Sequence, residues 1–421
     1  MNVLWVCNNI LPDFADEFGV NWNFGAGWAT GLLHAFFYVP EYKIGLCFPI
    51  IDEERMKNGE RMGCKYYSFH MSMNYREYDD SMKNEFKEII EDFQPDIVHI
   101  WGTERNHARA ALDACCELGL GNHVLVYIQG IASLMSLHYA TGVPQSVIEE
   151  KNNDDIVEIR EEINQFHRWG LSEEHVFQKA KYATGRTEWD NAYVKAVNQD
   201  VNYLPCNEIL RDAFYTCSEF WTIKRCRKFT IFVSQAHYPL KGLHFLIKAM
   251  PKILKKYPDT KVRIGGVNPT VPNKKGKVPI YGKYLNRLLQ EYGLVDKFYF
   301  LGTLRENDMV MEYLNANVYV LPSTIDNSPN SIAEAMMLGT PTVASYVGGV
   351  PSIVEHGKTG FLYPFDEYYM LAHYIIHLFE DDVLAEKISK EERAVAKKRH
   401  DVIATCNRMK EIYQQIAFDM G

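Results

Sequence analysis

The sequence lacks the cysteine spacing that would indicate a disulfide framework or a zinc site. Nine cysteines are scattered over 421 residues without a C-x-x-C pair, and Cys115-Cys116 is the only close pair. We interpret them as reduced thiols in a cytosolic protein. A D-x-D motif between the predicted strands is missing as well. The sequence therefore predicts neither a bound metal ion nor a cofactor.

Long apolar runs and an excess of basic residues are also missing. No stretch approaches the ~20 apolar residues of a membrane-spanning helix. The start, MNVLWVCNNILPDF, has no basic lead and indicates a first strand instead of a signal peptide. The net charge of −9 argues against a general nucleic-acid-binding protein. The short basic run Lys224–Lys228 is typical of solvated surface, although it could touch anionic lipid headgroups. We expect a cytoplasmic protein, with contact at the inner face of the membrane as an option.

What the chain does contain is a regular alternation of strand-like and helix-like segments. Apolar residues make up 47% of its length, which is enough for a large core, and the length predicts two domains. Alternation of this kind predicts parallel sheets covered by helices. The clearest segments are expected at Val3–Val6, Tyr42–Phe48, Lys83–Phe93, Ile97–Trp101, Val124–Ile128, Ala183–Arg186, Phe229–Ser234, Leu243–Tyr257, Val262–Ile264, Tyr284–Tyr292, Phe298–Leu301, Asp308–Asn315 and Val318–Leu321.

The stretch Leu321–Gly360 is the most informative part of the chain. A buried strand is expected to end at Leu321, and a helix follows with Ser328 as its N-cap, Pro329 in its first turn and Gly339 at its end. The helix N-terminus then lies at the carboxyl end of a sheet, where free N–H groups and the helix dipole favour an anion.

Two acidic residues flank this helix start. Asp326 lies on the loop before the helix, and Glu334 lies just over one turn into it, with seven residues between them. Helical side chains tilt toward the N-terminus, so the Glu334 carboxylate can reach back toward the same ligand. The pair suits a ligand that carries hydroxyl groups on both sides of a phosphate.

The run EAMMLGTPTVAS from Glu334, with Gly348-Gly349 and HGKTGFLYP after it, resembles the retaining nucleotide-sugar-dependent glycosyltransferases of family four. The family motif is Glu, seven residues, Glu, and here the first acid is Asp326. The resemblance implies the GT-B fold, an α/β architecture of two Rossmann-like, doubly wound domains that face a cleft. The implied parts are an acceptor-side domain at 1–222, a nucleotide-sugar-binding domain at 223–400, and a helix at 401–421 that packs back on the first domain.

The resemblance also implies roles at the donor. Glu334 would bind the ribose diol, since a carboxylate offers two acceptors, and Asp326 would lie by the donor sugar. Lys241, at a helix start, would neutralise the diphosphate. Ala236 stands where the family's G-R-x-x-x-x-K-G signature has Arg. Further donor-side candidates are the N–H groups of Asn330, Ser331 and Ile332, the base-contacting turn Thr303-Leu304, the glycine-rich loop with Gly25 and Gly27, and Arg186, which meets phosphate or pairs with an acid.

Acceptor-side candidates follow two predicted strands of the N-terminal half. Glu104 and His107 come just past the carboxyl end of the strand Ile97–Trp101, where ligands bind in such sheets. His99, inside that strand, is interpreted as a core histidine. Gln129 follows the next strand, at a position where many relatives carry histidine, and its amide can hydrogen-bond a sugar without acting as a base.

The implied activity is transfer of a glycosyl group from a nucleotide diphosphate sugar to a hydroxyl of a saccharide or lipid-linked saccharide, in cell-surface glycan synthesis. The family's usual mechanism retains the anomeric configuration, because attack is on the same face and the leaving phosphate takes the proton. Sugar-nucleotide epimerases and phosphorylases share the architecture, and a phosphorylase would show pyridoxal absorbance. The third alternative is a non-catalytic sugar-nucleotide-binding subunit, which would bind the donor without turnover. Donor hydrolysis or transfer that vanishes in Glu334→Ala would exclude this alternative.

Overall fold

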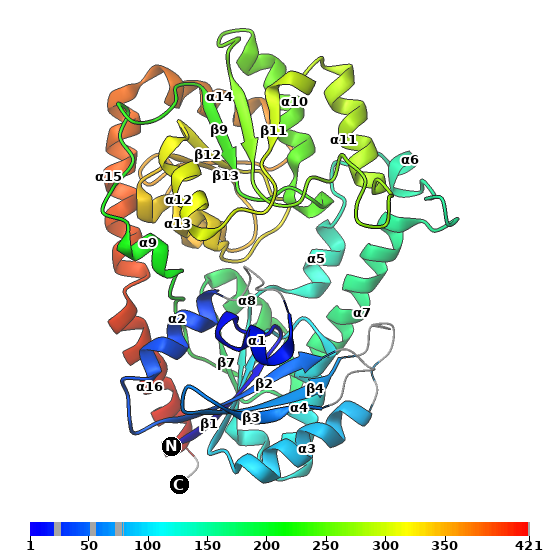
Figure 1. Cartoon of the computed structure of the whole chain (residues 1–421), viewed down its shortest axis with the longest axis vertical. Helices are drawn as coiled ribbons and strands as arrows, with labels where there is room; N and C mark the ends of the chain where they lie inside the picture. The colour runs from blue at the N-terminus through cyan, green and yellow to red at the C-terminus, as the bar shows by residue number, and fades with distance from the viewer. Residues whose placement is uncertain (21–26, 51–55, 72–77, 79, 420–421) are drawn as a thin grey trace. The chain divides into compact units, whose positions relative to one another are not determined.

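The computed structural model describes residues 1–20, 27–50, 56–71, 78 and 80–419. The chain divides into two compact units (Figure 1). Unit 1 comprises Met1–Leu134, Gln165–Arg211 and His400–Gly421, and unit 2 comprises Met135–Asn164 and Asp212–Arg399. Compared with the predicted division at residues 222 and 400, the change of unit comes at residue 211, and a segment of the N-terminal half groups with unit 2.

Unit 1 is built on a mostly parallel sheet. Its described residues form eight strands in the order β3-β4-β2-β1-β5-β6-β7-β8, and only β3 and β4 pair antiparallel. The strands are β1 Asn2–Cys7, β2 Lys43–Ile50, β3 Asn58–Arg61, β4 Cys64–His70, β5 Ile97–Trp101, β6 Val124–Tyr127, β7 Tyr182–Thr184 and β8 Asn202–Tyr203. The helices with residues in this unit are α1 Ala15–Phe18, α2 Gly27–Phe36, α3 Ser81–Phe93, α4 Asn106–Glu117, α5 Ala132–His138, α7 Glu158–Lys179, α8 Glu188–Val197 and α16 Val402–Phe418.

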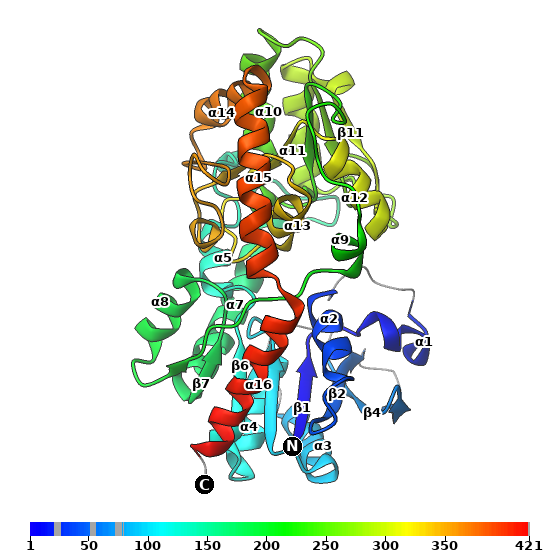
Figure 2. The same cartoon turned by 90° about the vertical axis from the view of Figure 1, so that its left-hand side faces the viewer.

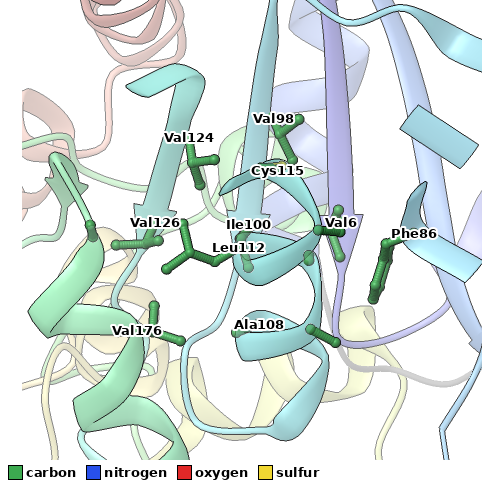
Figure 3. Close-up of a cluster of buried hydrophobic side chains, with 14 of the residues drawn as sticks. Val6, Phe86, Val98, Ile100, Ala108, Leu112, Cys115, Val124, Val126 and Val176 are labelled. Carbon is green, nitrogen blue, oxygen red and sulfur yellow. The ribbon is translucent and has the colours of Figure 1, made fainter. Parts of the chain in front are cut away.

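The central strands of unit 1 are apolar at nearly every position because helices cover both faces of the sheet. β1 pairs with β5 in parallel register, with Val3 opposite Ile97 and Cys7 opposite Trp101. Figure 3 shows one side of this core, where strand residues such as Ile100 and Val126 face Leu112 of α4. The continuous apolar runs that predicted these strands are therefore the buried centre of the unit.

The C-terminal helix α16 closes the other side of the unit 1 core. It packs against α2 and β5 (Figure 2). Its Tyr413 hydroxyl accepts a hydrogen bond from Trp5 Nε1 at 3.0 Å and lies 2.7 Å from Nδ1 of His99. His99 is fully buried, and burial lowers its pKa to about 3, so the ring is a neutral core residue. The interpretation of His99 as a core histidine is confirmed.

A buried carboxyl group in unit 1 makes stability depend on pH. Glu173 of α7 is almost fully buried, and its two oxygens lie 2.6 Å from Thr103 Oγ1 and 2.7 Å from the Ala132 nitrogen. Burial raises the pKa of Glu173 to about 8, against 4.5 for an ordinary glutamate. Between these values the folded chain holds a proton that the unfolded chain releases. Stability is therefore greatest at low pH within this window and falls as the pH rises.

We expect Glu173→Gln to flatten this pH dependence, since a neutral amide can bond the same two partners. The wild type should lose about 1.4 kcal/mol of unfolding free energy per pH unit through this group, relative to the variant. Urea unfolding of both proteins at several pH values between 5 and 8 measures the difference. Glu174→Gln, at the exposed neighbouring position, is the matched control and should follow the wild type. Parallel curves for Glu173→Gln and the wild type would contradict the assignment.

Unit 2 carries a second sheet whose neighbouring strands all run parallel. Over the described residues its order is β11-β10-β9-β12-β13-β14. The strands are β9 Thr230–Val233, β10 Lys261–Ile264, β11 Phe298–Phe300, β12 Val318–Leu321, β13 Thr342–Ser345 and β14 Phe361–Tyr363. The helices are α6 Gln145–Ile148, α9 Asp212–Thr216, α10 Leu243–Leu254, α11 Ile280–Glu291, α12 Glu306–Asn315, α13 Asn330–Leu338, α14 Tyr368–Glu380 and α15 Asp382–Arg399. Because the strands are parallel, all their carboxyl ends lie at one edge.

The predicted α/β architecture is confirmed, and β5 and β12 have the predicted bounds. Among the described residues no helix is long and apolar enough to cross a membrane. The β3–β4 hairpin was not predicted, because the four residues of β3 are polar. A two-residue turn, Met62-Gly63, joins its strands, and both residues have positive φ (54° and 75°), as a type I′ turn requires.

Candidate active site

The loop between β12 and α13 forms the centre of the candidate site. α13 begins at Asn330 and its N-cap is Pro329, with ψ of 118°, so the prediction of Ser328 as N-cap is wrong by one position. The cause is that Pro329 keeps an extended backbone and the helix starts after it. Gly339 ends the helix with φ of 80°, as predicted. The N-cap residue, Pro329, makes no side-chain hydrogen bond to the first turn.

The first turn of α13 therefore offers backbone N–H groups at the carboxyl edge of the sheet. The three N–H groups that the sequence predicts to bind an anion differ in whether they already have a hydrogen-bond acceptor within the protein. The Ile332 N–H donates to the Pro329 carbonyl at 3.0 Å, and the Ile332 side chain is fully buried. Asn330 and Ser331 are half-buried at the start of the helix. Of the three predicted anion-binding groups, those of Asn330 and Ser331 therefore stay as candidates.

Glu334 lies one turn further along α13 and is 4% exposed. The Tyr313 hydroxyl of α12 lies 3.2 Å from Glu334 Oε2 and 3.0 Å from the Ser331 carbonyl oxygen. A buried carboxylate costs free energy unless it is hydrogen-bonded, and Tyr313 meets part of that need. Tyr313 was missed as a site residue, since its place on the apolar side of the predicted helix indicates only a core residue.

Lys241 and Asp326, which the resemblance places at the donor, form an ion pair with each other. Nζ of Lys241 lies 2.9 Å from Oδ2 of Asp326, and each side chain is 15% exposed. Ser323 Oγ lies 3.3 Å from the same carboxylate oxygen. Burial acts to lower the pKa of Lys241, but the Asp326 carboxylate outweighs it and holds that pKa well above its usual value. The lysine is therefore a fixed cation, with 84 residues of chain between it and its partner.

Two glycines allow the loops of this site to pack closely. Gly242 has φ of 66°, and a Cβ atom there would lie 1.8 Å from the Pro322 carbonyl oxygen. Gly348 has φ of 49°, and a Cβ atom there would lie 2.1 Å from the Asp326 carbonyl oxygen, which also accepts a hydrogen bond from the Gly349 N–H. Both contacts are with backbone atoms, so a side chain at either position would displace the loop that carries Asp326.

We expect Gly348→Ala to displace Asp326 and to lower the free energy of unfolding by more than the ~1–3 kcal/mol that a positive φ costs a non-glycine residue. Gly357→Ala is the matched control, because Gly357 has φ of 76° but no described atom within 4 Å of a Cβ. Denaturant unfolding of both variants separates the backbone penalty from the clash. Equal losses of stability in the two variants would contradict the close-packing argument.

Thr303 and Leu304 follow β11 at the same carboxyl edge of unit 2. Thr303 is exposed and Leu304 is half-buried. The turn before them is anchored because the Gly266 N–H donates to the Gly302 carbonyl at 2.8 Å. These two residues are placed on an accessible turn of the unit that carries Glu334, Lys241 and Asp326.

In unit 1, two of the predicted acceptor-side residues come together through a third that was missed. Asn8 Nδ2 lies 3.1 Å from Glu104 Oε1 and 3.0 Å from Gln129 Oε1. Oε2 of Glu104 is buried and accepts no hydrogen bond from a described residue. Asn8 directly follows the central strand β1, and that position at the carboxyl edge of a parallel sheet was the signal that could have found it.

The other predicted residues of unit 1 have different surroundings. His107 is fully buried on α4 and stacks on Phe69, and burial lowers its pKa to about 3, so the ring offers no surface to an acceptor in this structure. Arg186 is buried with the Glu208 carboxylate, so of the two readings left open it takes the acid pair. It also donates to the Gln129 carbonyl at 3.1 Å. Gly27 begins α2, and Gly25 lies outside the described residues.

The comparison with protein families bears on the unit that holds this site. Residues 218–395 match the family model described as glycosyl transferases group 1. This region, which is less than half of the chain, is similar to that family. A curated relative, an uncharacterized glycosyltransferase of Methanocaldococcus jannaschii, is 35% identical over 138 residues, which cover 32% of this chain and 32% of that protein. Across the first curated relatives the matched stretches span only 28% to 56% of the relatives' lengths.

Solved structures extend the likeness to the whole chain. Sucrose-phosphate synthase from Thermosynechococcus elongatus superposes with a TM-score of 0.74 at 17% identity, over 100% of both chains. The Anabaena protein HepE, solved in complex with UDP-glucose, gives a TM-score of 0.64 at 16% identity, over 100% of this chain and 99% of that one. The chain therefore has the GT-B fold. Among its described residues, no group of three or more His, Cys, Asp or Glu side chains is arranged to hold a metal ion.

Proposed function

We propose that this chain is a group 1 glycosyltransferase that moves a sugar from a nucleotide diphosphate sugar to a hydroxyl group of a saccharide or lipid-linked saccharide. The observation that carries the proposal is the first turn of α13, with its N–H groups at the edge of a parallel sheet and the buried Glu334 carboxylate one turn along. An anion is stabilised at such a helix start. A carboxylate held by Tyr313 offers acceptors to the two hydroxyls of a ribose.

Charge stabilisation is the main chemical task that these residues would perform. Negative charge grows on the leaving diphosphate as the bond to the sugar breaks. Lys241 and the N–H groups of Asn330 and Ser331 would face that charge in fixed positions, which lowers the barrier because little reorganisation is needed. Asp326, paired with Lys241 at 2.9 Å, would lie beside the donor sugar and orient its hydroxyls.

The proposed stereochemistry is retention of the anomeric configuration. Glu104 and Gln129, bridged by Asn8, would bind hydroxyls of the acceptor. The proton of the attacking hydroxyl would pass to the oxygen of the leaving phosphate on the same face of the sugar. Cell-surface glycan synthesis, from the cytoplasmic side, is the setting that we propose.

A thermal-shift screen tests the donor. A ligand that binds only the folded chain raises the midpoint of unfolding, and at about 100 times its Kd it adds about 2.7 kcal/mol. UDP-glucose is the first compound, since a solved structure of similar fold contains it, and other UDP-, GDP- and ADP-sugars follow. The configuration of the product, read by NMR, tests retention. Absence of stabilisation by every nucleotide sugar would overturn the proposal, and binding without turnover on any acceptor would favour a sugar-nucleotide-binding subunit.

A further inference from the structure

One segment of unit 2 comes from the N-terminal half of the chain. Residues 135–164 pack on the rest of unit 2 through polar contacts at several places. Arg287 pairs with Glu150 at 2.9 Å, and Lys277 pairs with Asp154. Nε2 of the buried His244, in the first turn of α10, lies 3.0 Å from the Thr141 carbonyl oxygen. The segment is therefore docked on unit 2 at both its beginning and its end.

The beginning of this segment contacts both loops that carry the ion pair of the candidate site. The carbonyl of His138 accepts a hydrogen bond from Thr324 Oγ1 at 2.9 Å, and Thr324 lies two residues before Asp326. The ring of Tyr139 lies nearly parallel to that of Tyr238, with centroids 6.4 Å apart and 17° between the planes. The Tyr238 ring in turn lies 5.8 Å from Nζ of Lys241.

Tyr139 has a hydrogen-bond partner of its own, separate from its contact with Tyr238. Its side chain is almost fully buried, and its hydroxyl donates to Oε2 of Glu162 at 3.0 Å. Glu162 belongs to α7, a helix of 22 residues. Tyr139 is thus bonded to α7 and lies beside the Tyr238 ring, which in turn lies beside the Lys241 ammonium.

We propose that Tyr139 is a positioning residue for the Lys241–Asp326 ion pair and acts through the Tyr238 ring. The neighbouring His138 carbonyl assists by accepting a hydrogen bond from Thr324, on the loop that carries Asp326. The catalytic role of Tyr139 rests on the function proposed above, because it concerns the alignment of Lys241 with a diphosphate. The structural role of Tyr139 does not rest on it, since the supported Tyr238 ring should shield Lys241 in the protein without any ligand. A cation beside an aromatic ring that is itself supported has fewer positions to occupy, which favours the geometry needed for charge stabilisation.

The ligand-free test measures the reactivity of Lys241 toward an acetylating reagent, read by mass spectrometry. The exposed Lys252 on α10 is the internal reference. Tyr139→Leu removes the aromatic ring, and we expect it to raise acetylation of Lys241 relative to Lys252 by about threefold or more, because local opening exposes the amine. Tyr139→Phe keeps the ring and should stay within about twofold of the wild type. Tyr363→Phe, which removes the hydroxyl of another fully buried tyrosine in unit 2, on β14, should change nothing.

Donor kinetics provide the second arm. With a nucleotide sugar identified by the screen, we expect Tyr139→Leu to lower kcat/KM by about tenfold, and Tyr139→Phe to recover most of it. Melting temperatures of all variants check that the folded fraction is equal at the assay temperature. Unchanged acetylation of Lys241 in Tyr139→Leu, or equal effects of Leu and Phe, would overturn the positioning role. Wild-type protein that binds no nucleotide sugar would overturn the proposed function alone, because the acetylation result stands without a donor.

Discussion

Replacing Lys241 with methionine is expected to lower the rate of glycosyl transfer by about 10²–10³ without unfolding the protein, as loss of one fixed charge-stabilising donor typically does. Lys241 is held beside Asp326 by an ion pair of 2.9 Å. In the proposed mechanism it therefore faces the leaving diphosphate in one position. Methionine has a similar length and keeps the apolar stem in place. Initial rates with the donor from the screen, at saturating acceptor, measure the loss in kcat and in kcat/KM.

Two further variants make the result for Lys241 specific. Lys252→Met removes an exposed lysine of α10 and should leave the rate unchanged. Lys241→Met combined with Asp326→Asn removes the unpaired carboxylate that the single variant leaves half-buried, a group that by itself destabilises the site. If the double variant regains wild-type activity, the loss came from the stranded carboxylate and the role of Lys241 as the diphosphate cation is wrong. If it stays inactive while Asp326→Asn alone keeps its activity, the cation is required.

The features of the site that depend on neighbouring residues in the chain were predictable from the sequence. β12 was found to the residue because four consecutive apolar residues form a strand buried on both faces. Gly339 was recognised as the end of α13 because only glycine takes that backbone conformation without cost. The helix start at the carboxyl edge of the sheet follows from these two facts together, and so does the placement of Glu334.

The features that depend on packing between distant segments were not predictable. Lys241 and Asp326 were each assigned to the donor, but nothing in their spacing indicates that they bond to each other. Histidine is a residue type that often binds ligands, but His107 is in the environment of a core residue, because α4 places its ring against Phe69. Arg186 took Glu208 as its partner, and no local pattern marks that glutamate. Burial of a polar side chain is decided by the neighbours that the fold supplies.

The docking of residues 135–164 on unit 2 is a further case of the same kind. From its sequence, this charge-rich helical stretch is expected to pack on the sheet that precedes it in the chain. In the structure, acidic residues of this stretch pair with Lys277 and Arg287 inside unit 2 instead. The sequence does contain the complementary charges, but pairing them requires the fold, since more than a hundred residues separate the partners.

Glu334→Gln is expected to weaken binding of the nucleotide by about 10- to 100-fold, since a hydrogen bond to a charged group is worth ~1.5–3 kcal/mol. Glutamine preserves the shape of the side chain and an acceptor for the Tyr313 hydroxyl, which lies 3.2 Å from Oε2, so the fold is retained. The amide loses the negative charge and one of the acceptors for a ribose diol. Calorimetric titration with the free nucleoside diphosphate measures the change in Kd directly and does not depend on the acceptor.

The comparison among three variants identifies which part of the Glu334 contact matters. Tyr313→Phe removes only the hydroxyl that orients Glu334 and should weaken binding less than Glu334→Gln does. Glu334→Ala removes both acceptors, so it should bind no better than Glu334→Gln, and it should abolish donor turnover. Glu355→Gln, an exposed partner of Lys358 in the same unit, should bind as the wild type does. Nucleotide affinity in Glu334→Gln within about twofold of the wild type would exclude Glu334 as the ribose ligand, because a lost charged hydrogen bond cannot cost so little.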